Sequence, residues 1–517
     1  MRTISQALAR AQPGDAVLVR AGVYRETLRP RLGGREGSPI TVAAMPGDEV
    51  VVTGADPVPG GWRSERNGTW RLDWRGPDLR IYSADPVFRR EMLIADGAVM
   101  RPAATLSDLR PGRFWVEGPP ESPRAIIARF IGGSVPETVE VGTRSELFWP
   151  VGRDGAACGD ASMPGYFRLV GLTFRYATNP AQQGAVCVGS AGSVAEDVRV
   201  EWTNSLGIDL SGRGHTLRRV RADLNGQLGW GGSCRGCTID EGAAVGNNWK
   251  GFDPFWEAGG IKLTRTSDTA LRRFYAAWND GPGIWLDIDD PDNTVEGSLS
   301  VANQVAGIML EFATTGTLVQ HNVVARTRWR DWSGTGILSQ AASENALLHN
   351  TVVENEGTGV WLRLDPARRA PDGRNVVAHN WVVGNGTVAG HGDREAREMS
   401  VEGTSPAHVH SSRFTANAYG RLGRQSPRST FFVHPFEGSG GAGFRSDDLS
   451  RWRELVGGDR GARLVRLGES VEVGALGRVD AGAPRTAPIP FARAGADLSL
   501  VRARGDWRNA PMRPAWP

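Results

Sequence analysis

The chain has 517 residues, of which 40% are hydrophobic and 23% are charged, so it has ample material for a buried core. The 68 Gly and 18 Trp residues, without a collagen-like period, favour a turn-rich β protein. The net charge of +3 comes from acids and bases that are mixed along the chain, without a Lys/Arg block, so we expect no nucleic-acid partner. No apolar run reaches about 18 residues, so we expect no membrane-spanning helix.

The first 60 residues predict an N-terminal cap followed by the first strands of a repetitive fold. A short amphipathic helix is expected from Ser5 to Ala11, then a turn and strands. The segment MRTISQALARAQPGD contains no apolar signal core. Two compartments therefore stay open: the cytoplasm, or the periplasm or exterior if a signal peptide is missing from this sequence. The oligomeric state also stays open.

Residues 61–150 interrupt the repeat that follows them. They are rich in Trp, Arg and Pro, as in GWRSERNGTWRLDW, and predict an inserted β-rich side domain. The repeat resumes near Tyr166.

A Gly-led motif then recurs with alternating apolar residues. The steps between successive copies are 23, 22, 31, 23, 24, 29 and 23 residues, and the copies are GAVCV, GIDLS, GWGGS, GIKLT, GIWLD, GIMLE, GILSQ and GVWLR, starting at Gly184, Gly207, Gly229, Gly260, Gly283, Gly307, Gly336 and Gly359. A period near 23 with at least two short strands in each coil predicts a right-handed parallel β-helix over 151–415. A β-sandwich or a propeller is the alternative, and propeller blades repeat at about 40 residues or more.

Asn and His residues recur at the same spacing. Asn225, Asn279, Asn303 and Asn355 each lie four residues before a motif Gly, where we expect Asn to adopt the left-handed backbone of a sharp turn. The histidines of QHNVV, LHNTV and AHNWV are expected to form a structural stack rather than a catalytic group; they are His321, His349 and His379.

The C-terminal part, 416–517, is expected to hold further coils and irregular capping structure. GFRSDDLSRWRELVGGD predicts one surface helix, and the Pro/Arg-rich tail predicts irregular structure. Elsewhere in the chain, Cys234 and Cys237 form a lone CxxC without a second ligand pair. We therefore expect all four cysteines, including Cys158 and Cys187, to serve as small buried hydrophobic residues.

The fifth motif position carries the candidate chemistry. Because side chains alternate along a strand, Trp285 and Asp287 face outward when Ile284 and Leu286 face the core. Asp287 and Glu311 occupy this position in consecutive coils, so stacking places their carboxyl groups about 5 Å apart. A pair at about 5–5.5 Å is what a retaining glycosidase uses. The alternatives are a plain solvated surface or a Ca²⁺ site supplied by DIDDPDN; otherwise no cofactor is expected.

Other side chains on or near this face suit a sugar. Lys262, one coil before Asp287, is expected to keep that carboxylate ionised, and the Trp rings offer flat faces for a pyranose. The candidate substrate-binding residues are Lys262, Trp285, Glu257, Trp256, Asp289, Gln340, Trp361 and Arg363.

The stretch from Trp256 to Phe312, with GGIKL, GIWLD and a following strand that ends in Glu, resembles the β-helix glycoside hydrolases, notably the family 120 β-xylosidases. The N-terminal segment and the 61–150 insertion are similar to those of β-helix carbohydrate-active proteins. The resemblance implies retaining, exo-acting hydrolysis of a carbohydrate, with Asp287 as nucleophile and Glu311 as acid/base. The long acidic turn DIDDPDN departs from the family pattern and bears on a substrate subsite.

Two other functions remain as hypotheses. A β-helix polysaccharide lyase would use Lys262 or Arg363 as its base, but three coils lie between these two residues in this register. A non-catalytic glycan-binding or structural β-helix would bind sugar without turnover.

Overall fold

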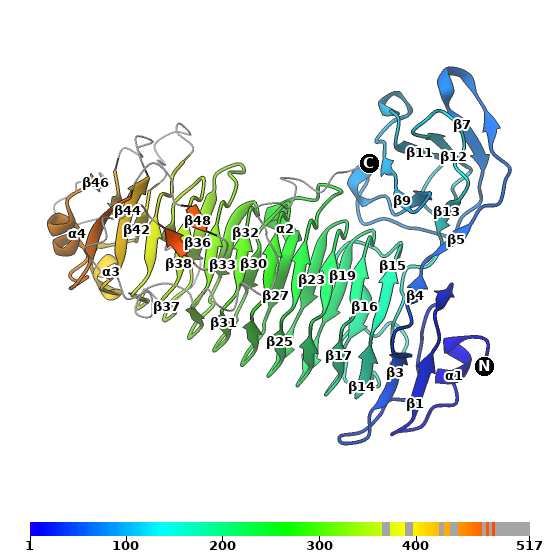
Figure 1. The fold of residues 1–517 in the computed structure, drawn as a ribbon, viewed down its shortest axis with the longest axis horizontal. Coiled ribbons are helices and arrows are strands. Elements are labelled where there is room, and N and C mark those ends of the chain that lie inside the picture. Colours follow the sequence, from blue (N-terminus) through cyan, green and yellow to red (C-terminus); the bar gives the residue numbers. More distant parts are fainter. Residues whose placement is uncertain are drawn as a thin grey trace. The chain divides into compact units, whose positions relative to one another are not determined.

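The computed structural model describes residues 1–363, 373–387, 397–422, 429–434, 443–467, 472–474 and 478–480. Its fold is the right-handed parallel β-helix expected from the repeat. These residues divide into two compact units: unit 1 holds 1–232 and 247–257, and unit 2 holds 233–246 and the described residues from 258 onward. In each unit the coils stack as successive rungs (Figure 1). Among the described residues no helix is long and apolar enough to cross a membrane.

A full coil of the β-helix contributes one strand to each of three parallel sheets, here called A, B and C, whereas the first two coils contribute only to A and B. The sequence had indicated at least two strands in each coil. In unit 1, sheet A contains β1 (Ala16–Val19), β3 (Ile40–Ala44), β14 (Phe167–Val170), β17 (Val194–Glu196) and β21 (Thr216–Arg218). Sheet B contains β2 (Gly22–Tyr24), β4 (Val50–Thr53), β15 (Leu172–Arg175), β18 (Arg199–Glu201) and β22 (Arg221–Asp223). Sheet C contains β16 (Gly184–Val188), β19 (Leu206–Leu210) and β23 (Leu228–Gly232), with β20 (Gly212–Arg213) following β19.

Helix α1 (Ile4–Leu8) caps the first coil of unit 1. Thr3 accepts a hydrogen bond from the Gln6 N–H, and the Glu26 carboxylate accepts from Ile4 and Ser5, so the free amides of the helix start are satisfied. Ile4 and Leu8 are buried, which closes the open end of the solenoid. Unit 1 also contains α2 (Pro254–Glu257).

Two small sheets project from unit 1 between its first coils. One has the order β5-β13-β8-β9 and the other β10-β11-β12-β7-β6, and their strands are largely antiparallel. The strands are β5 (Ala55–Pro57), β6 (Arg63–Ser64), β7 (Trp70–Asp73), β8 (Leu93–Ala95), β9 (Ala98–Val99), β10 (Arg101–Pro102), β11 (Arg113–Glu117), β12 (Ala125–Arg129) and β13 (Val139–Gly142). Short 3-10 helices lie at Arg66–Gly68, Pro86–Phe88 and Leu106–Asp108. The two small sheets share a separate hydrophobic core around Phe114, Ile126 and Phe130.

In unit 2, sheet A contains β25 (Thr238–Asp240), β28 (Ala270–Arg272), β31 (Thr294–Glu296), β34 (Leu318–Gln320), β37 (Ala346–Leu348), β40 (Val376–Ala378) and β43 (Arg413–Thr415). Sheet B contains β26 (Ala243–Val245), β29 (Tyr275–Ala277), β32 (Leu299–Val301), β35 (Val323–Ala325), β38 (Thr351–Val353), β41 (Trp381–Val383), β44 (Ala418–Leu422) and β47 (Arg463–Leu467). Sheet C contains β27 (Gly259–Thr264), β30 (Ile284–Asp287), β33 (Val305–Glu311), β36 (Gly334–Gln340), β39 (Val360–Arg363), β42 (Met399–Glu402), β45 (Phe431–His434) and the antiparallel β46 (Phe444–Ser446).

Parallel coils continue beyond residue 415 in unit 2, where the sequence repeat had faded, because β44 pairs in parallel with β47. The remaining elements are β24 (Cys234–Arg235), the pair β48 (Glu472–Gly474) and β49 (Arg478–Asp480), α3 (Pro406–Ser411) and α4 (Leu449–Leu455). Helix α4 is the one expected from GFRSDDLSRWRELVGGD, but it is not a purely surface helix because Trp452 and Leu455 are buried. The expected irregular tail falls largely outside the described residues.

The repeated Asn residues act through their side chains, and the expectation of a left-handed backbone at these positions is wrong. The residue before each of them takes the positive φ instead; examples are Leu224, Trp278 and Ala302. Asn303 is fully buried, donates to the Ala276 carbonyl at 2.9 Å and accepts from the Asn279 N–H at 3.1 Å. Each such amide therefore satisfies the buried backbone of the coil before it.

The His stack is confirmed. The rings of His321 and His349 lie 5.1 Å apart with planes 8° from parallel, and those of His349 and His379 lie 4.9 Å apart at 6°.

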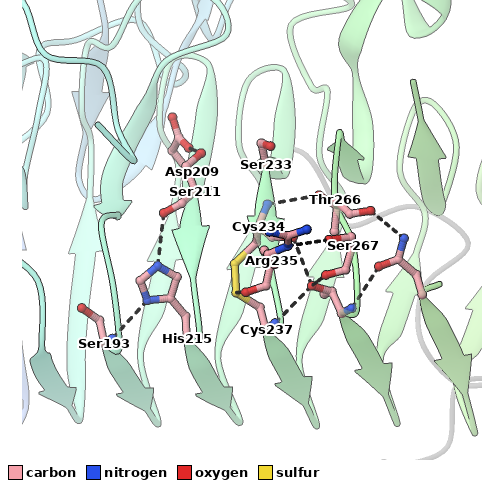
Figure 2. The surroundings of a disulfide bond; sticks show 12 residues. Ser193, Asp209, Ser211, His215, Ser233, Cys234, Arg235, Cys237, Thr266 and Ser267 are labelled. Atoms are coloured by element: carbon pink, nitrogen blue, oxygen red, sulfur yellow. Dashed lines mark hydrogen bonds between the residues drawn. A yellow bond between two sulfur atoms is a disulfide. The ribbon is translucent and has the colours of Figure 1, made fainter. Parts of the chain in front are cut away.

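Cys187, Cys234 and Cys237 are buried as expected, but the cysteines are more than small hydrophobic residues, because Cys158 bonds to Cys187 and Cys234 bonds to Cys237. In unit 2, Figure 2 shows the Cys234–Cys237 bond beside Thr266, whose hydroxyl accepts from the Cys234 N–H at 3.2 Å. Both cysteines of this pair are 1% exposed, so the CxxC forms a buried structural disulfide.

Candidate active site in unit 2

A column of polar residues runs along the C sheet of unit 2. Asp287 on β30 is the direct partner of Glu311 on β33. Glu311 pairs in turn with Gln340 on β36, and Gln340 pairs with Arg363 on β39. This confirms the expected register of the fifth motif position. Adjacent parallel strands lie about 4.8 Å apart, so the two acidic residues are immediate neighbours.

The same column continues past the last residue that the motif identified. Arg363 pairs with Glu402 on β42, and Glu402 pairs with His434 on β45. Sequence reasoning missed both residues because these strands, MSVE and FFVH, have lost the leading Gly.

The side chains on the outward face of these strands are buried. The exposed fractions of Lys262, Asp287, Glu311 and Gln340 are 6%, 3%, 5% and 7%. Trp285 and Trp361 are exposed by only 2% and 5% and pack with Met309 and Leu338 in an apolar cluster. The exposed stacking faces expected for these two Trp residues are therefore wrong, because neighbouring apolar side chains of the same face cover their rings.

Lys262 and Asp287 form a buried ion pair. Lys262 Nζ lies 3.0 Å from Asp287 Oδ2 and 3.9 Å from the centre of the Trp285 ring. An ammonium over an aromatic face gains a further electrostatic attraction. Among the residues that the structure describes, the other carboxyl oxygen, Asp287 Oδ1, is buried and has no hydrogen-bond partner. Asp287 Oδ1 is thus the carboxyl oxygen that no protein group engages.

Glu311 has a different environment from Asp287. The Gln340 amide donates to Glu311 Oε1 at 3.0 Å, and the Arg363 guanidinium donates to Gln340 Oε1 at 3.1 Å. Arg363 also lies 5.3 Å from the Trp332 ring centre and 5.5 Å from that of Trp361. Gln340 thus separates Glu311 from the cation, so the two acidic residues of the pair differ in their closest donors.

The acidic turn after β30 contributes one residue that sequence reasoning missed. Asp290 is fully buried, and its carboxylate accepts from the N–H groups of Asp287 at 2.6 Å and Thr266 at 2.5 Å. Burial raises the pKa of Asp290 to about 8, although these two hydrogen bonds lower it. Asp290 holds the backbone at the point where β30 ends.

Asp289 does not extend the column, contrary to expectation. The strand ends at Asp287, and Ile288 and Asp289 take positive φ angles of 66° and 56°. The turn therefore interrupts the alternation, and Asp289 is exposed to solvent.

Trp256 and Glu257 belong to α2 of unit 1. The Glu257 carboxylate accepts from the Gln182 side chain at 2.5 Å. The Trp256 ring stacks on Tyr82, with ring centres 5.9 Å apart, and lies 5.6 Å from Phe88. Since Tyr82 is 79% exposed, this aromatic group is open to solvent.

The described residues contain no group of three or more His, Cys, Asp or Glu side chains placed to hold a metal ion. All four cysteines form disulfides. The imidazole rings of His321, His349 and His379 are stacked in parallel, so their nitrogen atoms do not point to one place. These residues therefore do not fit a copper centre.

Fold and site together define a right-handed parallel β-helix with a buried acidic pair on one outer sheet face. The family model described as periplasmic copper-binding protein (NosD) matches residues 235–397. Comparison with curated proteins gives no significant match.

Solved structures share the fold, which confirms the resemblance to β-helix carbohydrate-active proteins at that level. The complex of XylC with xylose has a TM-score of 0.61 at 16% identity and covers 83% of this chain and 82% of its own. The A-module of the mannuronan C-5 epimerase AlgE6 from Azotobacter vinelandii has a TM-score of 0.50 at 12% identity, with 89% and 94% covered.

Proposed function

We propose that this protein is a retaining, exo-acting glycoside hydrolase whose catalytic residues are Asp287 and Glu311. The observation that carries the proposal is the direct pairing of these two acidic residues on neighbouring strands, with different closest donors. Retaining enzymes need two carboxyl groups close together in distinct roles. The fold shared with XylC in complex with xylose gives this class further support.

Asp287 suits the role of nucleophile. The Lys262 ammonium at 3.0 Å neutralises the carboxylate, and the Oδ1 atom is left to attack the anomeric carbon. Attack forms an ester between Asp287 and the sugar as the bond to the leaving oxygen breaks. Asp290, through its bond to the Asp287 N–H, orients the nucleophile.

Glu311 suits the role of acid/base. In the first step its carboxyl group gives a proton to the leaving oxygen, and in the second the resulting carboxylate takes a proton from the water that attacks the anomeric carbon. The second attack releases Asp287, so the enzyme returns to its starting state with retained configuration. The neutral Gln340 amide fixes the Glu311 side chain without a direct ion pair to Arg363. The mechanism uses no cofactor.

The burial of the acidic pair supports an exo mode of action. With Asp287 and Glu311 exposed by only 3% and 5%, the site suits the end of a saccharide better than the middle of a long chain. The substrate is accordingly a carbohydrate with a free terminal sugar.

The lyase alternative has less support. A lyase base must hold a free electron pair, whereas Lys262 is in an ion pair with Asp287 and Arg363 is a guanidinium bonded to Gln340. A product that absorbs in the near ultraviolet would favour the lyase.

We further propose an exported, oxidising location. Two disulfides are rare in a cytosolic protein, and the matched family model describes a periplasmic protein.

The test compares Asp287→Asn and Glu311→Gln with wild type on a panel of nitrophenyl glycosides that includes the β-xyloside. Asp287→Asn should lower kcat/KM by more than about a thousandfold, and Glu311→Gln by about a hundred- to ten-thousandfold. Asp268→Asn is the matched control, because its side chain is 62% exposed on a turn. Wild-type turnover that survives in both site variants would overturn the proposal.

A further inference from the structure

A cavity of about 550 Å³ lies within unit 1, apart from the residues assigned to catalysis. Its lining includes Arg29, Glu146, Trp149, Gln183 and Asp209, together with the segment 150–158. Its size falls in the usual range of small-molecule sites, and most of these side chains are polar.

Asp209 is the central polar group of this cavity. It lies on β19, between Cys187 on β16 and Gly231 on β23. The Ser211 hydroxyl donates to Asp209 Oδ1 at 2.6 Å (Figure 2). Asp209 Oδ2 has no hydrogen-bond partner among the described residues, so it is available to a ligand. Burial, and secondarily the charge of Glu257, raise the pKa of Asp209 to about 7.

One wall of the cavity is a covalently anchored cover. The Cys158–Cys187 disulfide ties the segment 149–163 to β16, and Cys158 Sγ lies 3.5 Å from the Asp209 carbonyl oxygen. Trp149 and Met163, the two ends of this segment, pack against Cys187. The cavity is therefore a constructed feature of unit 1 rather than a gap between surface loops.

Another part of the lining consists of polar side chains that are bonded to each other. The Gln183 amide donates to Glu146 Oε1 at 2.9 Å, and Arg29 pairs with Glu146 Oε2. The lining carries two cationic residues, Arg29 and Arg153, and three acidic ones, Glu146, Asp154 and Asp209, so its formal charge is −1 when Asp209 is ionised. An anionic ligand is repelled by that balance when Asp209 is ionised.

We propose that this cavity is a second saccharide-binding site, separate from the Asp287–Glu311 pair, which takes the end of a neutral oligosaccharide. Carboxylate and amide groups supply acceptors and donors for sugar hydroxyls, and Trp149, which is 9% exposed, adds apolar lining beside them. Asp209 Oδ2 accepts from a sugar hydroxyl, Gln183 fixes a second hydroxyl, and Trp149 contacts the ring. The inference does not depend on the proposed hydrolase.

The test measures binding of four neutral trisaccharides (xylotriose, cellotriose, mannotriose and maltotriose) and of trimannuronate to the full chain by titration calorimetry and ligand-detected NMR. At least one neutral sugar should bind, and Asp209→Leu, which replaces the carboxylate by an apolar group, should weaken that binding at least tenfold. Asp268→Asn should leave it unchanged. Glu311→Gln should abolish turnover and leave this binding intact, which separates failure of this proposal from failure of the hydrolase.

Cys158→Ala/Cys187→Ala provides a second perturbation that spares the polar groups. Releasing the cover should weaken the same binding event while glycoside turnover stays at the wild-type level. The proposal is overturned if no neutral trisaccharide binds, if binding is unaffected by both Asp209→Leu and the cysteine variant, or if trimannuronate binds more tightly than the neutral sugars. If Asp209→Leu fails to fold, the cysteine variant and a crystal of wild type soaked in the tightest sugar decide the matter, with no density in the cavity counting against it.

Discussion

Replacing Lys262 by Met removes the cation of the buried ion pair and leaves Asp287 without its partner. Two unit charges 3.0 Å apart attract by about 5.5 kcal/mol at an effective dielectric constant of about 20. The side chains are only 7% and 4% exposed, so solvent screens this attraction little. Removing one member of such a pair typically costs about 3–5 kcal/mol. Lys262→Met should therefore lower the free energy of local opening of β27 and β30 by about that amount.

Hydrogen exchange of the backbone amides in β27 and β30, followed by mass spectrometry, measures this opening free energy directly. The double variant Lys262→Met/Asp287→Leu should recover at least half of the loss, since it leaves no unpaired buried charge. Arg326→Met is the control, because Arg326 pairs with Glu354 at a 47% exposed position and should contribute less than about 1 kcal/mol. The reasoning fails if Lys262→Met loses no more than Arg326→Met, or if the double variant is worse than Lys262→Met alone.

Three further predictions test other parts of the structure. The Asp209 pKa of about 7 lies above its ordinary value of 3.8, so between these values the folded state retains a proton that the unfolded state loses. The contribution of Asp209 to stability should therefore fall as the pH rises from about 4 to 7. Asp209→Asn should remove this contribution, so the thermal midpoint should differ less between about pH 5 and about pH 8 in the variant than in wild type. Asn322→Ala should cost about 1–3 kcal/mol in urea unfolding, because buried Asn322 donates to the Val295 carbonyl at 2.9 Å; an unchanged midpoint would mean that water replaces the amide. Cys158→Ala/Cys187→Ala should lower the free energy of unfolding by about 2–5 kcal/mol. Treatment of wild type with a reductant should reproduce this loss.

The sequence predicted the architecture because the β-helix repeats a local pattern. Spacing alone placed Asp287 beside Glu311 and Gln340 beside Arg363, since the sheet C strands of these four coils carry the same Gly-led motif. The pattern failed where a coil lost its Gly, as at Glu402. It also misplaced the first copy, because Gly184 pairs with Leu206 rather than with Gly207.

Burial and covalent links were not predictable from the same pattern. Alternation shows that Trp285 points away from the core, but not that Met309 and Leu338 pack beside it. The Cys158–Cys187 bond joins residues 29 apart, and Cys158 lies before β14 in an irregular segment whose path has no periodic signal. The role of Asp290 depends on a tight turn, and its neighbour Asp289 has the same sequence environment but is exposed.

The most direct test of the catalytic assignment is covalent trapping of the nucleophile. Wild-type protein is incubated with the 2-deoxy-2-fluoro analogue of the glycoside that it turns over, digested and analysed by peptide mass spectrometry. The retaining mechanism predicts one fluorosugar per chain, esterified to Asp287, and no label on Asp287→Asn. A label on another carboxylate, or turnover with inverted configuration and no label, would contradict the assignment.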